Sequence, residues 1–424
     1  MKNSTKITNA SIESAGLPKD PKQVIAEYIW NGFDAKATSV AIDISSNELG
    51  YIERIRIMDN GEGIVPDLLP HSFGNFLDSL KKTAPKRSSY TRGKKGKGRF
   101  SFSLFATRAI WHTVVAVDNE VITYRLVIDR ASKEEYESSE PQRSNAASTG
   151  TTVVLEGIFG LNAAMLESEE FTDFLAQEFG WFLHLNKDLD YTIKINGKVI
   201  AYDQLIQETD TTSFTIYSPE ENSFIFKVNY IRWKQPIGDR YYYYFLNSQK
   251  MEVAKVLSSF NNNAIEFHHS VYVESAFFNH FEQSEIVLSN EGNLFSEKEH
   301  QVVYRRLMTE LRDLLDRKQK KYVREQAVTI KMQELAQKDL LPRYDTSEKD
   351  KKRKSTLLQL VEELYIADPR AFVSIKADLI RTYLGFLDLL LQTDRKLEIL
   401  PIIEQAIPLS DKERERIKEL LGRQ

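Results

Sequence analysis

Two hydrophobic periods follow one another in the N-terminal part of the chain. After Pro21, apolar residues recur every three or four positions, which is the spacing of one helix face; they are Val24, Ile25, Tyr28, Ile29 and Phe33. Apolar and polar residues then alternate through Val40–Ile44 and again through Ile55–Ile57, as in half-buried strands. The pattern predicts a helix from Pro21 to about Phe33, followed by two strands.

The mixture of helix and strand continues to about residue 160. Residues 81–99 are polar, rich in Lys, Ser, Thr and Gly, and have no apolar period, so they predict a mobile loop. A helix is expected over Phe100–Ala109. Further strands are expected at Val114–Val117, Val121–Ile128 and Thr151–Leu155, the first two forming a hairpin, with a polar connector at 131–149.

A second α/β pattern begins near residue 161. A helix is predicted from Asn162 to about Leu185, and Asn196-Gly197 predicts a type I′ turn between two short strands. Aromatic-rich strands are expected at Phe224–Trp233, Tyr241–Leu246 and Phe267–Val273. We therefore predict an N-terminal domain over 1–160 and an α/β domain over 161–292.

The remaining residues, 293–424, predict a helical region. Ser296–Gln337 has the pattern of one long charged helix or of two, and 342–355 is polar and basic, as in a linker. Asp368-Pro369 suits the start of a helix, and Ser410 with Glu413 has the spacing of a capping box.

Composition narrows the class of protein. The chain has 424 residues, of which 42% are hydrophobic and 28% charged, with a net charge of −4. Such a chain has no global field that attracts nucleic acid, so nucleic-acid binding requires a local basic patch. It has no cysteine, which excludes disulfides, thiolate metal sites and a cysteine nucleophile. No apolar run is long enough to span a membrane and the polar N-terminus lacks the apolar core of a secretory signal, so we expect a cytoplasmic protein.

Three polar residues lie on one face of the first predicted helix. Glu27, Asn31 and Asp34 are spaced i, i+4 and i+7, so their side chains project to the same side. An amide oxygen can hold Mg²⁺ beside phosphates without adding negative charge, and a carboxylate can accept a proton from water. A solvated helix face has the same pattern, so these three residues alone do not establish a functional site, and other motifs in the chain are needed.

A glycine-containing turn follows the second predicted strand. Period-two alternation puts Asp59 on the same face as Ile55 and Ile57, the face that the helix covers. A carboxylate at that position requires a partner, and an adenine amino group is one candidate. Gly61 and Gly63 permit a tight turn and close approach of a flat base, although an ordinary Asp-Asn-Gly turn has the same sequence.

The polar loop ends in a second glycine motif. Gly93, Gly96 and Gly98 are interspersed with Lys94, Lys95 and Lys97 just before a predicted helix. Exposed backbone N–H groups and lysines favour phosphate, although the spacing is not that of a Walker A loop. Thr151, at the start of a predicted strand, has a hydroxyl that can bind a base or an ordered water.

These motifs together resemble the Bergerat nucleotide-binding fold of the GHKL superfamily, which includes gyrase-type topoisomerases, heat-shock chaperones, histidine kinases and MutL. The resemblance rests on E-x-x-x-N-x-x-D-A from Glu27, D-x-G-x-G from Asp59, G-x-x-G-x-G from Gly93 and the later Gly-Thr pair, in that order. The implied fold class is α+β: a Bergerat-type α/β sandwich ATPase domain, then a transducer-like α/β domain and a helical C-terminal region.

The resemblance implies a role for each matched position. Glu27 resembles the general base that activates water, Asn31 the Mg²⁺ ligand, and Asp34 the supporting acid. Asp59 resembles the residue that reads adenine, with Gly61 and Gly63 in its turn, and the glycine motif from Gly93 to Gly98, with Lys94 and Lys97, resembles the ATP lid. Histidine kinases lack a hydrolytic base at the position of Glu27, so the implied branch is the one that hydrolyses ATP.

The second domain carries a further candidate. In hydrolysing relatives a transducer loop delivers a lysine to the γ-phosphate, and the sequence from Tyr244 to Lys250 is similar to that loop. Lys250 or Lys255 is then the sensor, although a solvated lysine fits either position. His268 and His269 lack a third metal ligand at suitable spacing and are expected in a strand, one inward and one outward.

The resemblance implies an ATP- and Mg²⁺-dependent ATPase that acts as a conformational switch and forms a homodimer. Nucleic acid or an effector protein is the expected partner, as in bacterial antiviral defence or DNA processing, and no membrane is involved. Lys349–Lys354 is the sequence feature that suggests nucleic acid. A chaperone-like clamp for proteins, and an ATP-sensing or histidine-kinase-like module without hydrolysis, are the alternatives.

Overall fold

The computed structural model describes residues 19–73, 98–238, 240–258, 260–261, 265–279, 298–373, 375–393 and 396–422. They fall into two compact units. One consists of Met1–Ile237, Tyr242–Val256 and Ser270–Lys298, and the other of Gly238–Tyr241, Leu257–His269 and Glu299–Gln424. The first unit contains two β-sheets, and the second contains the C-terminal helices.

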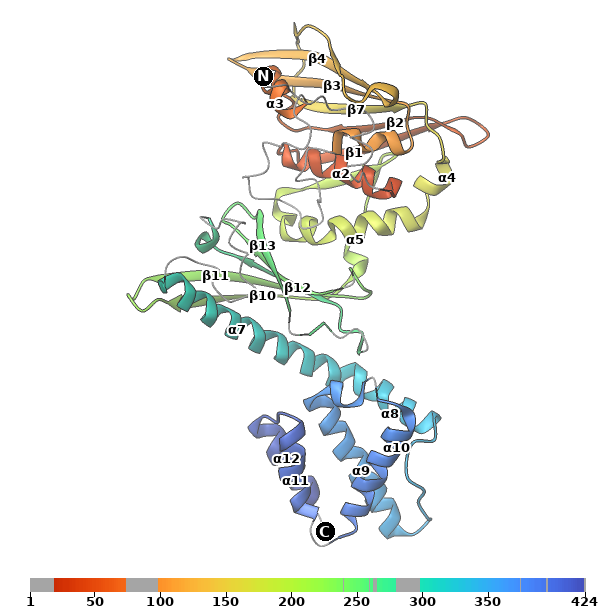
Figure 1. The fold of residues 1–424 in the computed structure, drawn as a ribbon, viewed down its shortest axis with the longest axis vertical. Helices are drawn as coiled ribbons and strands as arrows, with labels where there is room; N and C mark the ends of the chain where they lie inside the picture. Colours follow the sequence, from red (N-terminus) through yellow and green to blue (C-terminus); the bar gives the residue numbers. More distant parts are fainter. Residues whose placement is uncertain are drawn as a thin grey trace, which may run out of the picture. The chain divides into compact units, whose positions relative to one another are not determined.

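The larger sheet has nine strands in the order β5-β4-β3-β7-β2-β1-β8-β9, with β6 paired to β4 (Figure 1). Its strands are β1 Ser39–Ser46, β2 Ile52–Asp59, β3 Arg108–Val117, β4 Glu120–Asp129, β5 Glu137–Ser138, β6 Gln142–Arg143, β7 Gly150–Glu156, β8 Thr192–Ile195 and β9 Lys198–Val199. Both tight hairpin turns have left-handed residues at their centre: Asp118-Asn119 between β3 and β4, and Asn196-Gly197 between β8 and β9. The turn predicted at Asn196-Gly197 is therefore confirmed.

Helix α2 (Pro21–Asp34) lies against this sheet, as its apolar spacing predicts. Asp20 caps it by accepting a hydrogen bond from the Lys22 N–H, and Pro21 occupies the first turn, where its missing N–H costs nothing. The helix ends at Asp34, and Lys36 follows with a φ of 62°. These local signals fix the length of the helix and hence the position of its polar face.

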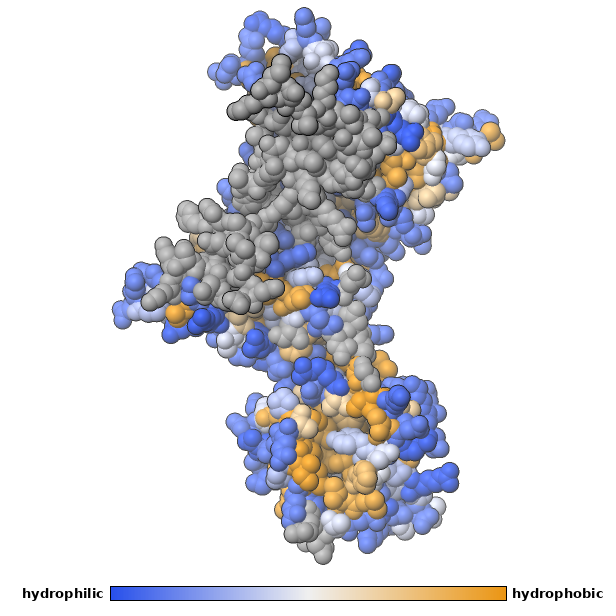
Figure 2. Space-filling model, in the orientation of Figure 1, coloured by the Kyte–Doolittle hydropathy of each residue, from blue (hydrophilic) through white to orange (hydrophobic). Residues whose placement is uncertain are grey.

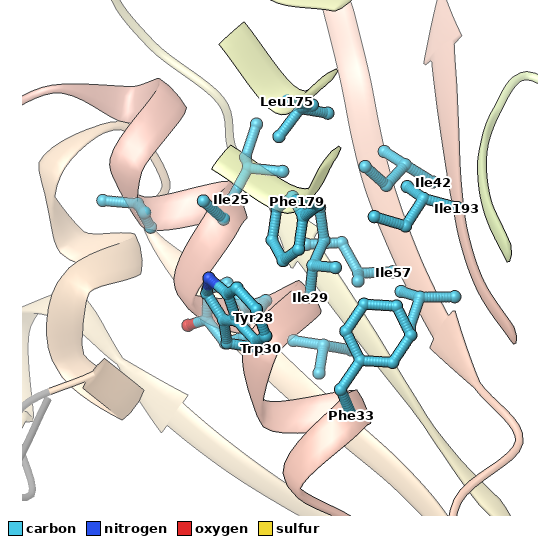
Figure 3. Close-up of a cluster of buried hydrophobic side chains, with 14 of the residues drawn as sticks. Ile25, Tyr28, Ile29, Trp30, Phe33, Ile42, Ile57, Leu175, Phe179 and Ile193 are labelled. Atoms are coloured by element: carbon cyan, nitrogen blue, oxygen red, sulfur yellow. The ribbon is translucent and has the colours of Figure 1, made fainter. Parts of the chain in front are cut away.

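The core between helices and sheet is largely aromatic and β-branched. Trp30 and Phe33 of α2 pack against Phe179 of helix α5 (Glu169–Leu185), with ring centroids 4.5 and 6.0 Å from the Phe179 ring (Figure 3). Ile42, Ile57 and Ile193 close the cluster from β1, β2 and β8. Each such side chain contributes about 1.5–3 kcal/mol on burial, so α2 is held rigidly by its apolar side.

The second sheet has five strands in the order β10-β11-β14-β12-β13. They are β10 Ile206–Tyr217, β11 Ser223–Trp233, β12 Tyr242–Leu246, β13 Glu252–Leu257 and β14 His269–Glu274. Helix α5 contacts this sheet as well, since the Trp181 ring stacks on Tyr272 at 5.0 Å and Tyr272 stacks on Tyr244 at 4.9 Å. The tyrosine run at 241–244 is thus used for strand packing, as its buried positions require.

The C-terminal helices are α7 Lys298–Tyr322, α8 Val328–Gln337, α9 Glu348–Ala367, α10 Ala377–Leu391, α11 Ile399–Ala406 and α12 Asp411–Gly422. A π-helical segment, Val323–Ala327, joins α7 to α8. The predicted long helix therefore runs on with one wider turn. The predicted capping box also forms, because the Ser410 N–H donates to Glu413 Oε2 at 2.8 Å and the Glu413 N–H is 3.4 Å from Ser410 Oγ.

Three predicted elements differ from the structure. The helix expected over Phe100–Ala109 is a 3₁₀ helix, η3 (Gly98–Leu104), followed by β3, because the apolar residues after Thr107 alternate and pair with β4 and β7. The helix expected from Asn162 divides into α4 (Ala163–Leu166) and α5, with Ser168 capping the second. Most of the predicted linker 342–355 belongs to α9, which Ser347 caps.

Short helices complete the described chain: η1 Pro66–Leu68, α3 Leu69–Ser72, η4 Arg130–Ser132, η5 Lys187–Leu189, η6 Asp203–Leu205, η8 Ala276–Phe278, η10 Pro369–Phe372 and η11 Lys396–Glu398.

The C-terminal helices expose apolar side chains on one face (Figure 2). On α10, Leu379, Phe386 and Leu389 are 60%, 62% and 59% exposed. No helix among the described residues is long and apolar enough to cross a membrane.

Candidate functional site

The polar face of α2 carries the three predicted side chains away from the core. Glu27 and Asp34 are half-buried and Asn31 is exposed, while Ile25, Ile29 and Phe33 on the other side are fully buried. The i, i+4, i+7 spacing thus brings the three polar residues to one accessible stripe, as predicted. Because the opposite side is packed in the core, the helix cannot turn about its axis, and the stripe keeps its orientation.

Glu27 meets the beginning of η3 across a short gap. A Cβ placed on Gly98 would lie 3.3 Å from Glu27 Oε2, so the carboxylate faces the Gly98 backbone. Burial raises the pKa of Glu27, and the Ser101 hydroxyl opposes that shift. The Oε2 atom is buried and has no hydrogen-bond partner among the described residues. A buried acceptor of this kind is ready to bind a water molecule or another donor.

Asp59 ends β2 beneath α2, on the face that alternation predicted. Its Oδ1 accepts hydrogen bonds from the N–H groups of Gly61 at 2.9 Å and Thr151 at 3.2 Å. Burial raises the Asp59 pKa, and these two N–H groups partly offset the shift. No donor within the described ranges reaches Oδ2, so Asp59 keeps one free acceptor for a ligand. Gly32 allows the helix this close, since a Cβ there would be 3.0 Å from Asp59 Cβ.

The turn after Asp59 requires both of its glycines. A Cβ on Gly61 would lie 2.6 Å from the Ala35 carbonyl oxygen, and one on Gly63 would lie 2.3 Å from that of Val114. Gly63 also has a φ of 79°, which a residue with a Cβ rarely adopts. The turn is therefore pressed between the end of α2 and strand β3.

Thr151 lies beside Asp59 through the strand register. Thr151 pairs with Asp59 on β2 and with Thr113 on β3, and the two threonine hydroxyls are 3.3 Å apart. A Cβ on Gly150 would lie 2.2 Å from the Asp59 carbonyl oxygen. The Gly-Thr pair is thus shaped to fit against the Asp59 turn.

Thr113 is a site residue that the sequence analysis missed. It is fully buried, and its Oγ1 accepts the Ile64 N–H at 2.9 Å, which ties the glycine turn to β3. The signal that identifies it is a polar residue at an inward position of an otherwise apolar strand, between Trp111 and Val115. Ser101, which faces Glu27, carried no comparable signal.

The rest of the second glycine motif falls outside the described residues. Gly93, Lys94, Gly96 and Lys97 are among those that the structure does not describe, whereas Gly98 is described and lies at Glu27. Their assignment to a phosphate-binding lid stays a prediction.

Lys250 and Lys255 have other contacts in the first unit. The Lys250 ammonium donates to the Leu185 carbonyl oxygen at 2.8 Å, at the end of α5, and its backbone φ is 57°. The Lys255 ammonium lies 4.6 Å above the Tyr242 ring. Neither lysine contacts Glu27, Asn31 or Asp59 in the described part of the chain. The assignment of a sensor lysine therefore stays a prediction.

The paired histidines are both buried, so the prediction that one points outward is wrong. His268 Nδ1 lies 2.5 Å from the Tyr241 hydroxyl, and His269 Nε2 lies 3.0 Å from Ser258 Oγ. Burial lowers the pKa of His269 to about 4. Hydrogen bonds from polar neighbours make an inward position acceptable for both rings.

The donor set at α2 fits a magnesium ion that is held mainly by phosphate and water. Within the described residues no group of three or more His, Asp or Glu side chains is arranged to hold a metal. Mg²⁺ commonly uses one or two protein oxygens and completes its shell with water and substrate phosphates. The exposed Asn31 amide, next to half-buried Glu27 and Asp34, can supply that single protein oxygen.

Comparison with known proteins decides the family of this domain. Residues 19–153 match the profile of the family described as "Histidine kinase-, DNA gyrase B-, and HSP90-like ATPase". This chain carries a GHKL ATPase domain. The matched range runs from the start of α2 to β7, so it includes Glu27, Asp59 and Thr151. The sequence-based expectation of a GHKL superfamily member with an α+β fold is confirmed.

Curated relatives are similar over parts of the GHKL domain. The DNA mismatch repair protein MutL of Methanoculleus marisnigri is 31% identical over 100 residues, which is 22% of this chain and 16% of the relative. MutL of Staphylococcus carnosus is 28% identical over 161 residues, 37% of this chain and 22% of the relative. The match to MutL of Deinococcus radiodurans covers 25% of that protein. The chain thus spans a quarter or less of each of these relatives.

Among solved structures, the ATPase region of Saccharomyces cerevisiae topoisomerase II is similar. The match has 11% sequence identity and a TM-score of 0.34, and it covers 60% of this chain and 71% of that chain.

Proposed function

We propose that the protein is a magnesium-dependent ATPase that acts as an ATP-driven conformational switch. The observation that carries the proposal is the state of Glu27: a half-buried carboxylate on the accessible face of α2, with a buried oxygen that lacks a partner among the described residues. Binding of ATP alone does not require such a group, whereas hydrolysis requires a base that takes a proton from water.

The proposed reaction is hydrolysis of ATP to ADP and inorganic phosphate. A water bound at Glu27 Oε2 gives a proton to the carboxylate as its oxygen bonds to the γ-phosphorus and the bond to the β–γ bridging oxygen breaks. Asn31 would hold Mg²⁺, which when bound neutralises charge on the phosphates. Asp34 supports the same polar stripe.

Adenine recognition is proposed for Asp59. Its Oδ2 is free to accept from the exocyclic amino group of the base, while Oδ1 is held by two backbone N–H groups. Gly61 and Gly63 keep the turn close to β3 and α2, which leaves room for a flat ring. Thr151 stands next to Asp59 and can contact the base or an ordered water.

We further propose that ATP closes the lid that includes Gly93, Lys94, Gly96 and Lys97, and that closure favours a homodimer. The named relatives are DNA mismatch repair proteins, which supports coupling of this switch to nucleic acid or to an effector that acts on it. The test below separates a kinase-like function from hydrolysis. A protein clamp would hydrolyse ATP as well, and stimulation of turnover by DNA would distinguish the nucleic-acid switch from it.

Glu27→Gln tests the proposal directly. The amide keeps the size of the side chain but cannot act as a base, so turnover should fall at least about 100-fold, while affinity for a non-hydrolysable ATP analogue stays within a few-fold. Phosphate release and calorimetric binding measure the two quantities. Because the pKa of Glu27 is raised, wild-type turnover should also fall as pH falls through that raised pKa.

Asp59→Asn is the matched variant, since it also replaces one site carboxylate by an amide. Its affinity for nucleotide should fall by about 10-fold or more. The amide N–H of the new side chain would face the adenine amino group, which is also a donor, so no hydrogen bond can form between them. Wild-type turnover in Glu27→Gln would refute the role of Glu27. Phosphate that appears on the protein rather than in solution would indicate a kinase.

A further inference from the structure

A basic cleft lies in the second unit, between the end of α7 and the start of α12. Its volume is about 390 Å³, and it is lined by Arg317, Lys320, Lys321, Arg324, Glu325, Ser410, Lys412, Glu413 and Arg416. Six of these side chains are basic and two are acidic, a local net charge of +4 in a chain whose net charge is −4. A concentration of one charge sign against the overall charge is typical of a binding site.

Helix geometry gathers the basic residues. Arg317, Lys320 and Lys321 lie on the last turns of α7, and Arg324 follows in the π-helical segment. The wider turn of a π-helix changes the direction of the side chains that follow it, and such turns are frequent at functional sites. Buried Val323 on the same turn anchors the backbone of this segment beside the cleft.

The opposite wall is fixed by the capping box at the start of α12. Glu413 is buried, and its carboxylate accepts both the N–H and the hydroxyl of Ser410, at 2.8 and 2.7 Å. Lys320 adds an ion pair with Glu413 at 3.1 Å and another with Asp316 at 3.4 Å. These contacts satisfy Glu413 internally, so it does not neutralise the other basic side chains of the cleft.

Three of the basic side chains have no acidic partner among the described residues. Arg317, Arg324 and Lys412 are exposed and have no hydrogen bond or ion pair with any described residue. Arg416 has one long ion pair, 3.6 Å to Glu363. Like charges around one cavity repel each other unless an anion lies between them, so the cleft is built for a ligand with several negative charges.

We propose that this cleft binds phosphate groups, carried either by the backbone of a nucleic acid or by a free polyphosphate. The lining has no aromatic side chain, so it offers no ring on which a base can stack. Arg and Lys that contact phosphate bind through charge and without sequence preference. The cleft lies outside the GHKL domain, so this inference does not depend on the proposed hydrolysis.

The test compares two triple variants with the same change of charge. Arg317→Gln/Arg324→Gln/Lys412→Gln removes the uncompensated residues of the cleft. Lys349→Gln/Lys352→Gln/Lys354→Gln removes three exposed lysines of α9, the stretch that sequence alone would select. Binding is measured without ATP, by fluorescence anisotropy with labelled single-stranded and duplex oligonucleotides and by calorimetry with tripolyphosphate. Thermal melting confirms that both variants are folded.

For the wild type we expect binding that weakens steeply with salt. The cleft variant should bind at least about 10-fold more weakly at 100 mM salt, with a shallower salt slope by roughly two to three, while the α9 variant stays within about twofold. Loss of oligonucleotide binding identifies nucleic acid as the source of the phosphates, and loss of tripolyphosphate binding alone identifies a free polyphosphate. The proposal is overturned if the wild type binds neither probe, if the cleft variant binds like the wild type, or if the α9 variant loses as much.

Discussion

Glu178 is a carboxyl of helix α5 that contacts the helix carrying Glu27. The Trp30 indole N–H donates to Glu178 Oε1 at 2.7 Å, one residue before Asn31. Burial raises the pKa of Glu178 to about 7, opposed by the Trp30 hydrogen bond and by the charge of Lys255. A carboxyl group with this pKa changes its protonation near neutral pH, at a contact that positions the polar face of α2.

Glu178 should therefore make stability depend on pH. Its folded pKa, about 7, lies above the ordinary value of 4.5, so the folded state holds more protons between these values and stability falls as pH rises through that window. The loss should be about 3 kcal/mol by pH 8. Glu178→Gln keeps an acceptor for Trp30 and has no charge to bury.

Urea unfolding of both proteins at pH 5 and pH 8 measures this effect. We expect the wild type to lose stability between the two values and Glu178→Gln to change much less. The same loss in both proteins would assign the pH dependence to other groups.

Sequence periodicity was sufficient to place the site residues that lie on regular helices and strands. Glu27, Asn31 and Asp59 are placed by a helical stripe and by strand alternation, and the structure puts Glu27 and Asp59 on the faces those periods predict. Thr113 and Ser101 depend on which strands and turns are neighbours in space, which no local pattern specifies. Glu178 had a signal that was not used: a carboxylate beside Phe179 on the apolar side of α5.

At the scale of elements, the turn from Gly61 to Gly63 joins α2, β2 and β3. Asn60 Oδ1 accepts the N–H groups of Thr38 and Ser39, both at 2.9 Å, and so ties the turn to the start of β1. The Tyr124 hydroxyl donates to the Ile64 carbonyl oxygen at 2.8 Å from β4. The position of the turn therefore depends on strands β1, β2, β3 and β4 and on the end of α2.

Comparing Gly63→Ala with Gly50→Ala distinguishes the cost of a left-handed backbone from the cost of a steric clash of the new Cβ. The two glycines have nearly equal φ, 79° and 78°, but a Cβ would lie 2.3 Å from the Val114 carbonyl oxygen at Gly63 and meet nothing within 4 Å at Gly50. Both variants should lose about 1 kcal/mol to the left-handed backbone. Gly63→Ala should lose roughly 2 kcal/mol more and bind ATP more weakly.

Thermal melting and nucleotide calorimetry measure these differences. The Gly50 variant, which lies in the β1–β2 turn, should bind ATP within about twofold of the wild type. Equal losses of stability and affinity in the two variants would show that the space around Gly63 is unimportant.

Two of the elements that sequence analysis predicted wrongly show why the local pattern was insufficient. The stretch after Phe100 contains apolar residues at both helical and alternating spacing, and pairing of β3 with β4 and β7 selects the strand. The basic stretch at 349–354 has linker composition, yet the Ser347 cap and the apolar residues from Leu357 onward make it the first turns of α9. Pairing with neighbouring strands decided the first case, and a local cap with an apolar helical period decided the second.

At the scale of the whole molecule, the basic cleft could not be found from the sequence. Lys320 and Glu413 are 93 positions apart, so the sequence does not show that the basic end of α7 faces the start of α12. The predicted site at Lys349–Lys354 relied on neighbours in sequence, whereas the cleft depends on how two helices of one unit are packed. The family of the N-terminal domain was accessible because its motifs are short, ordered and local.

The proposed ATP-driven dimer predicts a change of mass in solution. Light scattering with size exclusion should give the mass of one chain without nucleotide and of two chains with Mg²⁺ and a non-hydrolysable ATP analogue, because a ligand that favours the closed state shifts the population toward it. Asp59→Asn, with its weaker nucleotide binding, should stay at the mass of one chain under the same conditions. An unchanged wild-type mass would remove dimerisation from the proposal.

Lys250 occupies the end of α5, and that occupancy has a thermodynamic consequence. Its ammonium group neutralises the negative end of the helix through the Leu185 carbonyl, an interaction of about 0.3–1 kcal/mol. At this position the ammonium group contacts neither Glu27 nor Asp59 in the described part of the chain, so reaching a γ-phosphate there would require it to leave Leu185. If Lys250 is the sensor, the helix end and the nucleotide compete for one positive charge, which would weaken nucleotide affinity by roughly two- to fivefold. Nucleotide binding would then uncap α5, and an event at the phosphate would be transmitted to the helix that contacts both sheets.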